Sequence, residues 1–328
     1  MNNPVIDVTM QDPQAQYVLG IDIGGTNLRL ALCSSHQVGP YRWSTTLPQA
    51  PSPESVVESI RTGANALLQQ AGVSQSSLVA AGAGAPGITD TAQGIVIATS
   101  YLLGWRNVPL QALLEEALQV PASIDNDVNL AALGELNSGA AQEINDFVFI
   151  AVGTGVGAGI VLNRQLHRGS AWSAGEIGYM LVPGVSEAPA QRGEPGALES
   201  LVGGTGIQSQ WRKHWSAQAT ALPVDATPTE IFTAASAADP FALETLATAA
   251  KTLACAIYNT SLILNCKLFV LGGGVGSHPA FIATTQRFLN ERNSRTPLTV
   301  VPSALGPEAQ LAGALSLAWQ TVAQRTIP

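Results

Sequence analysis

Short apolar runs separated by polar or glycine-rich turns dominate the first part of the chain. YVLGIDI (Tyr17–Ile23) is apolar at nearly every position, which predicts a strand that is buried on both faces. Gly24–Asn27 then predicts a tight turn, and LRLALCS (Leu28–Ser34) predicts a second strand. A third strand is expected over Tyr41–Thr46. The chain is therefore expected to open with three strands.

A capping residue and a glycine delimit the first predicted helix. Ser52 can cap the helix, Pro53 suits its first position, and Glu54 adds a negative charge to its first turn. The helix is expected to run towards Gln70, and Gly72 is expected to stop it. Further strands are predicted over Leu78–Gly82, Gly94–Ala98 and Ala122–Asn126, and further helices over Pro109–Leu118 and through Leu130–Leu136.

The second half repeats the pattern of the opening. FVFIAV (Phe147–Val152) predicts a strand, GTGVG (Gly153–Gly157) a glycine turn, and AGIVLN (Ala158–Asn163) a returning strand. Two such units predict duplicated α/β domains that face each other across a cleft. The remaining predicted elements are a hairpin turn at Asn163-Arg164, helices around Gly206–Trp215, Thr229–Ala238, Phe241–Leu264, Pro279–Asn290 and Ala309–Gln324, and strands over Lys267–Gly272 and Leu298–Pro302.

The composition narrows the class of protein. With 328 residues, 46% of them apolar and only 12% charged, the chain is long enough for two domains and is not a disordered protein. Its net charge of −8 argues against binding nucleic acid through a basic face. Three widely spaced cysteines, the lack of a signal-peptide pattern at the N-terminus and the lack of a membrane-length apolar run predict a cytoplasmic location.

One glycine motif resembles a nucleotide fingerprint but lacks its context. GAGAPG (Gly82–Gly87) fits G-x-G-x-x-G, yet that fingerprint needs a helix to begin inside the motif. Pro86 and the following ITDTAQG instead predict a loop. The phosphate-binding pattern G-x-x-x-x-G-K-[ST] does not occur in the sequence.

Two other glycine turns favour phosphate binding. DIGGTN (Asp22–Asn27) and GTGVG (Gly153–Gly157) both lie between strands, where bare backbone N–H groups can approach phosphate oxygens. Asp22 would hold Mg²⁺ through water, since that ion keeps most of its hydration shell. Either turn alone is more typical of an ordinary hairpin, with Asp22 as a turn residue. A third glycine turn after Leu271 favours phosphate binding.

The order of these motifs resembles the ROK family (repressors, open reading frames, kinases). The resemblance implies a bacterial sugar kinase with the actin/hexokinase-like (ribonuclease H-like) ATPase fold, in which two α/β domains surround a cleft. It covers nearly the whole chain. It is carried by LGIDIGGTNLRLAL (Leu19–Leu32), GAPGITD (Gly84–Asp90), DNDVNLAALGE (Asp125–Glu135), VGTGVGAGIVLN (Val152–Asn163), AGEIGY (Ala174–Tyr179), LGGGV (Leu271–Val275) and LGPEAQLAGAL (Leu305–Leu315).

The resemblance also implies roles for single residues. Asp127 matches the catalytic aspartate, which would take the proton of a sugar hydroxyl as that hydroxyl attacks the γ-phosphate of ATP. The substrate side comprises Asn126, Glu176, Tyr179, Glu199, Pro86, Gly87 and Tyr101. The nucleotide side comprises Asp22, Gly24, Gly25, Thr26, Asn27, Thr154, Gly155, Gly273 and Gly274. Asn126-Asp127 is also typical of a helix N-cap, and both roles are compatible.

The chain departs from the family at its structural zinc site. Tyr179 stands at the position of the histidine ligand, and Ala190, Arg192 and Ala197 stand at the three cysteine positions. Neither alanine nor arginine binds Zn²⁺, so no zinc is expected. Tyr101 likewise stands where many relatives have an asparagine close to the sugar. The resemblance favours an ATP- and Mg²⁺-dependent, glucokinase-like kinase that phosphorylates the 6-hydroxyl of a hexose. These changes on the sugar side leave fructose, mannose, an N-acetylated hexosamine or an unusual sugar as alternative substrates.

Other functions within the family are less compatible with the chain. A repressor would need an N-terminal helix-turn-helix domain, and only sixteen residues precede the first predicted strand. A non-catalytic sugar-binding or regulatory protein remains an alternative to a kinase. The expected organisation is a disordered tail over 1–16, a small domain over 17–125 completed by the C-terminal helix of 305–328, and a large domain over 126–304. The family resemblance implies a homodimer that forms through the large domain.

Overall fold

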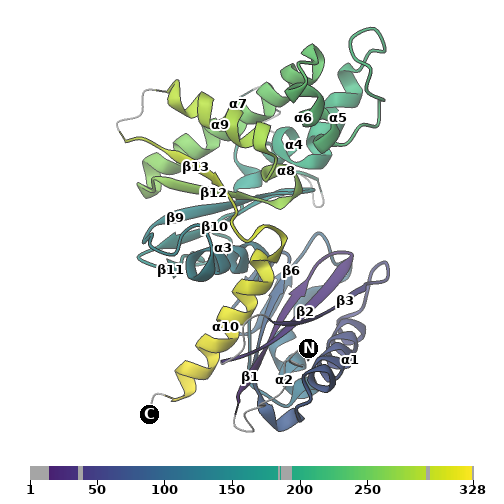
Figure 1. Ribbon diagram of the computed structural model, residues 1–328, viewed down its shortest axis with the longest axis vertical. Coiled ribbons are helices and arrows are strands. Elements are labelled where there is room, and N and C mark those ends of the chain that lie inside the picture. The colour runs from purple at the N-terminus through teal and green to yellow at the C-terminus, as the bar shows by residue number, and fades with distance from the viewer. Residues whose placement is uncertain (1–14, 36–39, 184, 186–193, 293–295, 327–328) are drawn as a thin grey trace, which may run out of the picture.

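A computed structural model describes residues 15–35, 40–183, 185, 194–292 and 296–326 of the chain. Residues 1–14 of the predicted tail, and the two zinc-ligand positions Ala190 and Arg192, therefore lie outside the described residues, whereas Ala15 of the tail packs against the core of the first sheet. Figure 1 shows two blocks stacked along the long axis, each built around a sheet of five strands. Helix α10 (Ala309–Thr326) returns from the upper block to lie against the lower one.

The first sheet has the strand order β3-β2-β1-β4-β8. Its strands are β1 (Tyr17–Ile23), β2 (Asn27–Ser34), β3 (Tyr41–Thr46), β4 (Leu78–Ala85) and β8 (Ala122–Asn126). The first three strands are antiparallel neighbours, whereas β4 and β8 run parallel to β1. β1 is buried along its whole length, as its apolar sequence predicts. In register, Asp22 of β1 pairs with Gly84 of β4, which pairs with Asp125 of β8.

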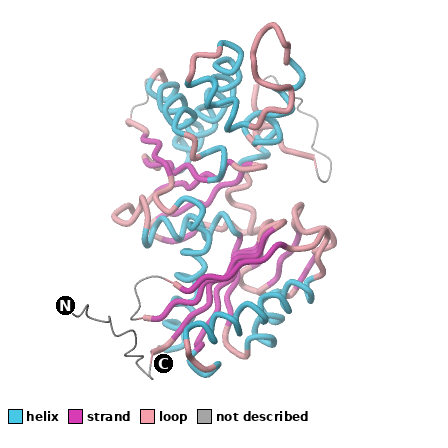
Figure 2. The backbone as a smooth tube through the Cα atoms, turned by 45° about the vertical axis from the view of Figure 1, so that its right-hand side comes forward, coloured by secondary structure: helices cyan, strands magenta, loops and turns pink. Residues whose placement is uncertain are grey.

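Helices cover both faces of this sheet. Helix α1 (Pro53–Ala71) packs on β2 and β3, and α10 packs on β1 and β4 (Figures 1 and 2). The predicted ends of α1 are confirmed, since the Ser52 side chain accepts a hydrogen bond from the Ser55 N–H and Gly72 has a φ of 69°. This left-handed backbone conformation suits a glycine.

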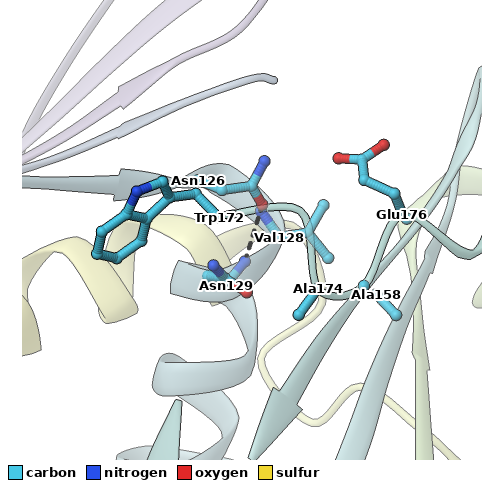
Figure 3. A pocket seen from close by; sticks show the side chains of 9 residues that line it. Asn126, Val128, Asn129, Ala158, Trp172, Ala174 and Glu176 are labelled. Carbon is cyan, nitrogen blue, oxygen red and sulfur yellow. Dashed lines mark hydrogen bonds between the residues drawn. The ribbon is translucent and has the colours of Figure 1, made fainter. Parts of the chain in front are cut away.

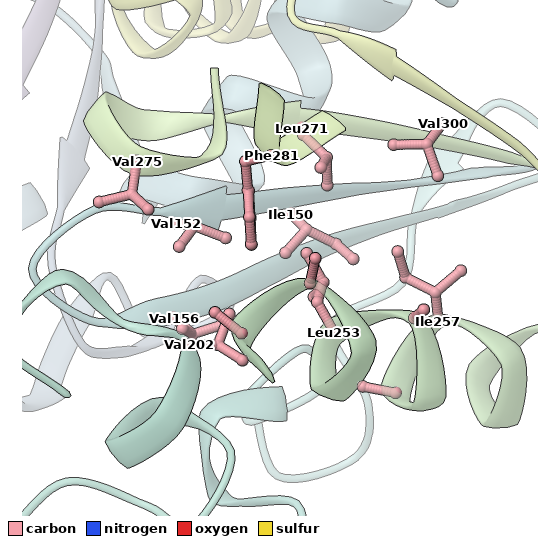
Figure 4. Packing of buried hydrophobic residues seen from close by; sticks show 14 of the residues in the cluster. Ile150, Val152, Val156, Val202, Leu253, Ile257, Leu271, Val275, Phe281 and Val300 are labelled. Carbon is pink, nitrogen blue, oxygen red and sulfur yellow. The ribbon is translucent and has the colours of Figure 1, made fainter. Parts of the chain in front are cut away.

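The second sheet has the order β11-β10-β9-β12-β13. Its strands are β9 (Phe147–Val152), β10 (Val156–Leu162), β11 (Gln165–Leu166), β12 (Leu268–Gly272) and β13 (Thr299–Pro302). Helices α7 (Pro240–Leu264) and α9 (Pro279–Asn290) cover one face, where Leu253 and Phe281 meet the side chains of β9 (Figure 4). Helix α3 (Asp127–Ser138) covers the other face and shares its core with α10.

Two glycines let α3 and α10 cross at short range. A Cβ added to Gly134 would clash with the carbonyl oxygen of Ala309, and one added to Gly313 would clash with that of Leu130. Side chains at either position would therefore force the helices apart. This crossing fixes α3, which begins at Asp127, against both sheets.

The structure corrects two details of the predicted elements. Ile88–Asp90 was expected to be loop, but it forms strand β5, which pairs with β6 (Ile95–Ala98) in a three-stranded sheet with β7 (Arg106–Val108). The returning strand of the second unit begins at Val156, so the glycine turn before it is shorter than expected. The remaining elements are α2 (Leu110–Leu118), α4 (Glu199–Val202), α5 (Gly204–His214), α6 (Pro228–Ser236), α8 (Gly273–Gly276), η1 (Gln75–Ser77), η2 (Ile177–Tyr179) and η3 (Gly306–Glu308). None of the helices described is long and apolar enough to cross a membrane.

Candidate active site

The junction of β8 and α3 places a capping residue beside a free carboxylate. The Asn126 Oδ1 atom accepts hydrogen bonds from the backbone N–H groups of Val128 (2.8 Å) and Asn129 (3.1 Å), so Asn126 is the N-cap of α3. Its Nδ2 atom donates to the carbonyl oxygen of Gly87 at 2.8 Å. The predicted capping role is thus confirmed for Asn126. Asp127 is the first residue of the helix.

The environment of Asp127 suits a proton acceptor. Burial, followed by the negative charge of Asp22, raises the pKa of Asp127 to about 7, although its hydrogen bond from the Val128 N–H opposes the shift. The charge of Glu176 adds to the increase. A carboxylate with a pKa near neutrality combines a large deprotonated fraction with useful basicity. Asp127 can therefore take up a proton at neutral pH.

Asp22 forms an ion pair with Arg29, a residue that no sequence motif indicated. The Arg29 Nε and Nη2 atoms lie 2.8 and 2.6 Å from the Asp22 Oδ2 atom, and Nη1 donates to the carbonyl oxygen of Pro307 at 2.7 Å. Burial raises the pKa of Asp22, and Arg29 partly offsets this. Both contacts reach Oδ2, so Oδ1 takes no part in the ion pair.

The first glycine turn is open to solvent. The Gly24 N–H donates to the carbonyl oxygen of Asn27 at 2.8 Å, which closes the turn between β1 and β2. Gly25, Thr26 and Asn27 are exposed. The turn therefore presents backbone N–H groups and a threonine hydroxyl to the space beyond the sheet, which is the arrangement that phosphate binding needs.

The second and third glycine segments belong to the other sheet. The Gly153 N–H donates to the Gly155 carbonyl at 3.0 Å, and Gly204 at the start of α5 donates to the Gly153 carbonyl at 2.8 Å. Thr154 is exposed at the tip of this turn. The third segment forms the short helix α8, in which Gly273 has a φ of 83° and Gly274 faces open space.

Carboxylates and phenols surround the space beside the second turn. The Glu199 Oε2 atom accepts a hydrogen bond from the Val156 N–H at 2.8 Å. Loss of hydration and the charge of Glu199 raise the pKa of Glu176, although its side chain is open to solvent. Tyr179 is 53% exposed, and the loss of part of its hydration raises its pKa. The negative charges of Glu176 and Glu199 raise this pKa further. These groups can exchange hydrogen bonds with the hydroxyls of a sugar.

Tyr101 lies between the two glycine turns. A Cβ added to Gly25 would lie 3.3 Å from the Tyr101 Cβ, and one added to Gly155 would lie 2.5 Å from the Tyr101 hydroxyl and close to the Glu199 carboxylate. Burial, and then the charges of Glu199, Asp127 and Glu176, raises the pKa of Tyr101 to about 12. The phenol therefore stays neutral at physiological pH.

A loop from the second sheet carries two site residues that sequence reasoning missed. The Arg168 Nε and Nη2 atoms lie 2.8 and 2.6 Å from the Oδ2 atom of Asp125, a residue that is 1% exposed. Trp172 has a φ of 62°, an unusual backbone conformation for a bulky residue. The contact of Arg168 joins positions 43 residues apart, which no local pattern predicts. The sequence feature that could have indicated Trp172 is its position four residues before the predicted substrate residue Glu176.

This loop closes a small hollow against the start of α3. The hollow has a volume of about 30 Å³, room for one water molecule. It is lined by Asn126, Val128, Asn129, Gly157, Ala158, Trp172, Ala174, Gly175 and Glu176. In Figure 3 the Asn126 amide lies between the Trp172 indole and the Glu176 carboxylate. A larger cavity of about 250 Å³ lies between α5 and α7, and none of the predicted site residues lines it.

The remaining predicted residues support the site rather than face it. Pro86 is buried, and Gly87 has a φ of 100° and accepts the hydrogen bond of the Asn126 amide. Ala197, at the third former cysteine position, accepts a hydrogen bond at its carbonyl oxygen from Ser200. Within the described part of the chain, no group of three or more His, Cys, Asp or Glu side chains is arranged to hold a metal ion.

Comparison with known proteins agrees with this geometry. The model of the ROK family matches residues 18–321. The chain is 34% identical to a glucokinase of Halalkalibacterium halodurans over 268 residues, which are 79% of this chain and 81% of that protein. It is 28% identical to an N-acetylmannosamine kinase of Escherichia coli over 298 residues, which are 90% of this chain and 96% of that protein.

A solved structure extends the comparison to the fold. The ROK family glucokinase from Streptomyces griseus in complex with glucose and AMPPNP superimposes with a TM-score of 0.77 at 26% identity. The match covers 93% of this chain and 99% of that one. The two stacked α/β blocks thus form the actin/hexokinase-like fold of these kinases. The chain belongs to the ROK family and is a sugar kinase.

Proposed function

We propose that the protein transfers the γ-phosphoryl group of ATP to the 6-hydroxyl of a hexose, with Asp127 as the general base. The observation that carries the proposal is the position of Asp127 at the start of α3, with a pKa of about 7, beside the charge of Asp22 and opposite Glu176. Glucose is the first candidate because the glucokinase of H. halodurans is 34% identical. An N-acetylated hexosamine is the second, because the N-acetylmannosamine kinase of E. coli matches 90% of the chain.

The proposed step moves one proton and one phosphoryl group. The Asp127 carboxylate accepts the proton of the sugar hydroxyl, and the hydroxyl oxygen forms a bond to the γ-phosphorus of ATP. The bond between that phosphorus and the bridging oxygen breaks, and ADP leaves with the electron pair. The products are a sugar phosphate and ADP. Asp127 then returns its proton to solvent.

The nucleotide contacts come from both blocks. The turn of Gly24, Gly25, Thr26 and Asn27 and the turn of Thr154 and Gly155 would receive the phosphates through N–H and hydroxyl donors. Gly274 leaves open space beside the second sheet for the rest of the nucleotide, and Gly273, with a φ of 83°, lets α8 begin against the backbone of Val152. The Asp22 Oδ1 atom, which Arg29 leaves free of its ion pair, would hold the water shell of Mg²⁺. The ion would neutralise charge on the transferred group.

The sugar side comprises Asn126, Glu176, Tyr179, Glu199 and Tyr101, with Pro86 and Gly87 shaping the turn behind the Asn126 amide. Both polar atoms of the Asn126 amide already have partners, so its contact with the sugar would use a remaining lone pair or N–H. Glu176 and Glu199 are free to accept hydrogen bonds from vicinal hydroxyls. We propose that Tyr179 donates the hydrogen bond of the family histidine and that no zinc is bound.

The use of ATP and the presence of free cysteines bear on the cellular location of the protein. We propose that the protein acts in the cytoplasm, where ATP is supplied and where Cys33, Cys255 and Cys266, which form no disulfide, stay reduced. We also propose a homodimer that forms through the block of residues 126–304, with 17–125 and 305–328 forming the small domain. Gel filtration with light scattering distinguishes a dimer from a monomer.

A sugar panel tests the proposed reaction. MgATP is supplied with glucose, mannose, fructose, N-acetylglucosamine or N-acetylmannosamine, and ADP release is followed by a coupled assay. Phosphorus NMR of the product then identifies the phosphorylated position. We expect release with glucose and a signal from the 6-phosphate. Faster ADP release with an N-acetylated sugar than with glucose would support the second candidate. No ADP release with any of the five sugars would contradict hexose phosphorylation.

A further inference from the structure

The Tyr101 side chain spans the gap between the two phosphate-facing turns. Its backbone and Cβ lie against Gly25 of the first sheet, and its hydroxyl lies against Gly155 of the second. The backbone of Gly25 and of Gly155 is not in the left-handed region that only glycine adopts readily. These glycines are therefore needed for the room that they leave and not for their backbone conformation. Tyr101 occupies part of that room.

The phenol group of Tyr101 lies beside the carboxylates of the proposed site. The hydroxyl is close to Glu199, and the negative charges of Glu199, Asp127 and Glu176 all act on it. An acceptor oxygen must come between Asp127 and the γ-phosphate, because the proton goes to the first as the bond forms to the second. The space that Gly155 leaves open by its missing side chain is therefore close to the region where such an acceptor would bind, and the Tyr101 hydroxyl takes up part of it.

The ring is held loosely enough to move. The Tyr101 N–H donates to the Thr99 hydroxyl at 3.1 Å, which anchors the backbone, but no hydrogen bond to the phenol oxygen is found within the described part of the chain. The residue is 48% exposed. A rotation about the side-chain bonds would therefore vacate the space without breaking a buried hydrogen bond, so a sugar can displace the ring.

On the basis of the proposed function, we infer that Tyr101 makes the enzyme select sugar over water as the phosphoryl acceptor. Water bound beside Asp127 would give its proton to that carboxylate, and its oxygen would form a bond to the γ-phosphorus as the bond to ADP breaks. The products would be ADP and inorganic phosphate. The Tyr101 ring prevents this reaction by filling the acceptor space until a sugar replaces it, and its role rests on volume rather than on its hydroxyl.

Three variants distinguish the effect of the volume of the Tyr101 ring from the effect of its hydroxyl group. Tyr101→Ala removes the ring, Tyr101→Phe keeps the ring without the hydroxyl, and Leu103→Ala shortens a neighbouring side chain of the same loop that is 69% exposed. Inorganic phosphate release from MgATP is measured without sugar, beside sugar-dependent ADP release. We expect Tyr101→Ala to raise sugar-independent phosphate release by about tenfold or more, the range that loss of a packed wall gives in substrate discrimination. In Tyr101→Phe the sugar-independent phosphate release should stay within about twofold of that of the parent protein, and Leu103→Ala should leave both activities within that range.

The double variant Tyr101→Ala/Asp127→Asn completes the test. The added phosphate release should disappear in it, because Asp127 takes the proton from water. Unchanged hydrolysis in a folded Tyr101→Ala variant would overturn the inference, as would an equal increase in Tyr101→Phe. The thermal unfolding curve of each variant establishes that it is folded. Sugar-dependent ADP release by the parent protein tests the proposed function separately, so failure of the two ideas can be distinguished.

Discussion

Asp22, near the end of β1, and Asp127, directly after β8, flank β4 on either side, and the negative charge of Asp22 helps to raise the pKa of Asp127 to about 7. Gly84 of β4 lies in register with Asp22 and Asp125, and a Cβ added to it would lie only 2.9 Å from the Leu130 Cδ1 atom of α3. The glycine thus lets the start of α3 approach the sheet. In the proposed mechanism the two carboxylates take different roles, because Asp22 is paired with Arg29 and Asp127 is not.

This relationship predicts the pH dependence of the reaction. A general base acts only when deprotonated, so kcat/KM for the sugar should reach half its maximum near pH 7, the pKa of Asp127. Below that pH it should fall by about tenfold per unit as the carboxylate becomes protonated. Initial rates in buffers of constant ionic strength provide the profile. A profile that is flat from pH 5 to pH 8 would contradict the assignment of Asp127.

Much of the fold was predictable because its signals are local. The apolar run of Tyr17–Ile23, the cap at Ser52 and the stop at Gly72 act within a few residues, and each gave the element that the structure contains. The N-cap role of Asn126 followed from the same kind of signal. Strand β5 (Ile88–Asp90) was missed because it is short and depends on pairing with β6.

The arrangement of the site was less predictable because it depends on distant contacts. Family resemblance pointed to Asp127, Glu176 and Glu199, whose environments the structure defines. It did not reveal that Arg29 pairs with Asp22, since the two residues face each other only after β1 and β2 form a hairpin. Nor did it show that Tyr101 contacts both glycine turns, which belong to different sheets.

The buried ion pair of Arg168 and Asp125 should contribute strongly to stability. Arg168→Met would leave an Asp125 carboxylate that is 1% exposed without its cation, which should lower the free energy of unfolding by about 3–5 kcal/mol. Urea denaturation measures this change. The exposed pair of Arg61 and Glu58 has the same 2.6 Å N–O distance and provides the control, because Arg61→Met should give no measurable change. Equal effects of the two substitutions would contradict the account of the buried pair.

Because α3 and α10 cross closely, one methyl group added at the crossing should lower the free energy of unfolding. Gly313→Ala places a Cβ against the carbonyl oxygen of Leu130, so the helices must separate. We expect a loss of about 1–3 kcal/mol in the free energy of unfolding, although alanine is the better helix former. Gly153→Ala is the matched control because a Cβ there meets nothing within 4 Å. A Gly313→Ala variant as stable as the parent protein would show that the crossing is not tightly packed.

Loss of the zinc ligands predicts a specific response to chelation. Elemental analysis of the purified protein should find far less than one zinc per chain, since Tyr179 and Ala197 cannot replace histidine and cysteine. EDTA should stop phosphoryl transfer, and Mg²⁺ alone should restore it fully because ATP requires that ion. The unfolding temperature should not change with EDTA. Recovery that requires added Zn²⁺ would contradict this prediction.

The role of Asp127 is tested most directly by its replacement with asparagine, which keeps the shape of the side chain but removes the base. The parent protein should release ADP from MgATP in the presence of glucose and yield glucose 6-phosphate. Asp127→Asn should lower kcat by about 10²–10⁴-fold with little change in nucleotide affinity. Asp146→Asn, at an exposed position whose carboxylate accepts a hydrogen bond from the Asn163 N–H, should behave as the parent protein. Sugar phosphorylation at an undiminished rate by a folded Asp127→Asn variant would contradict the proposed mechanism.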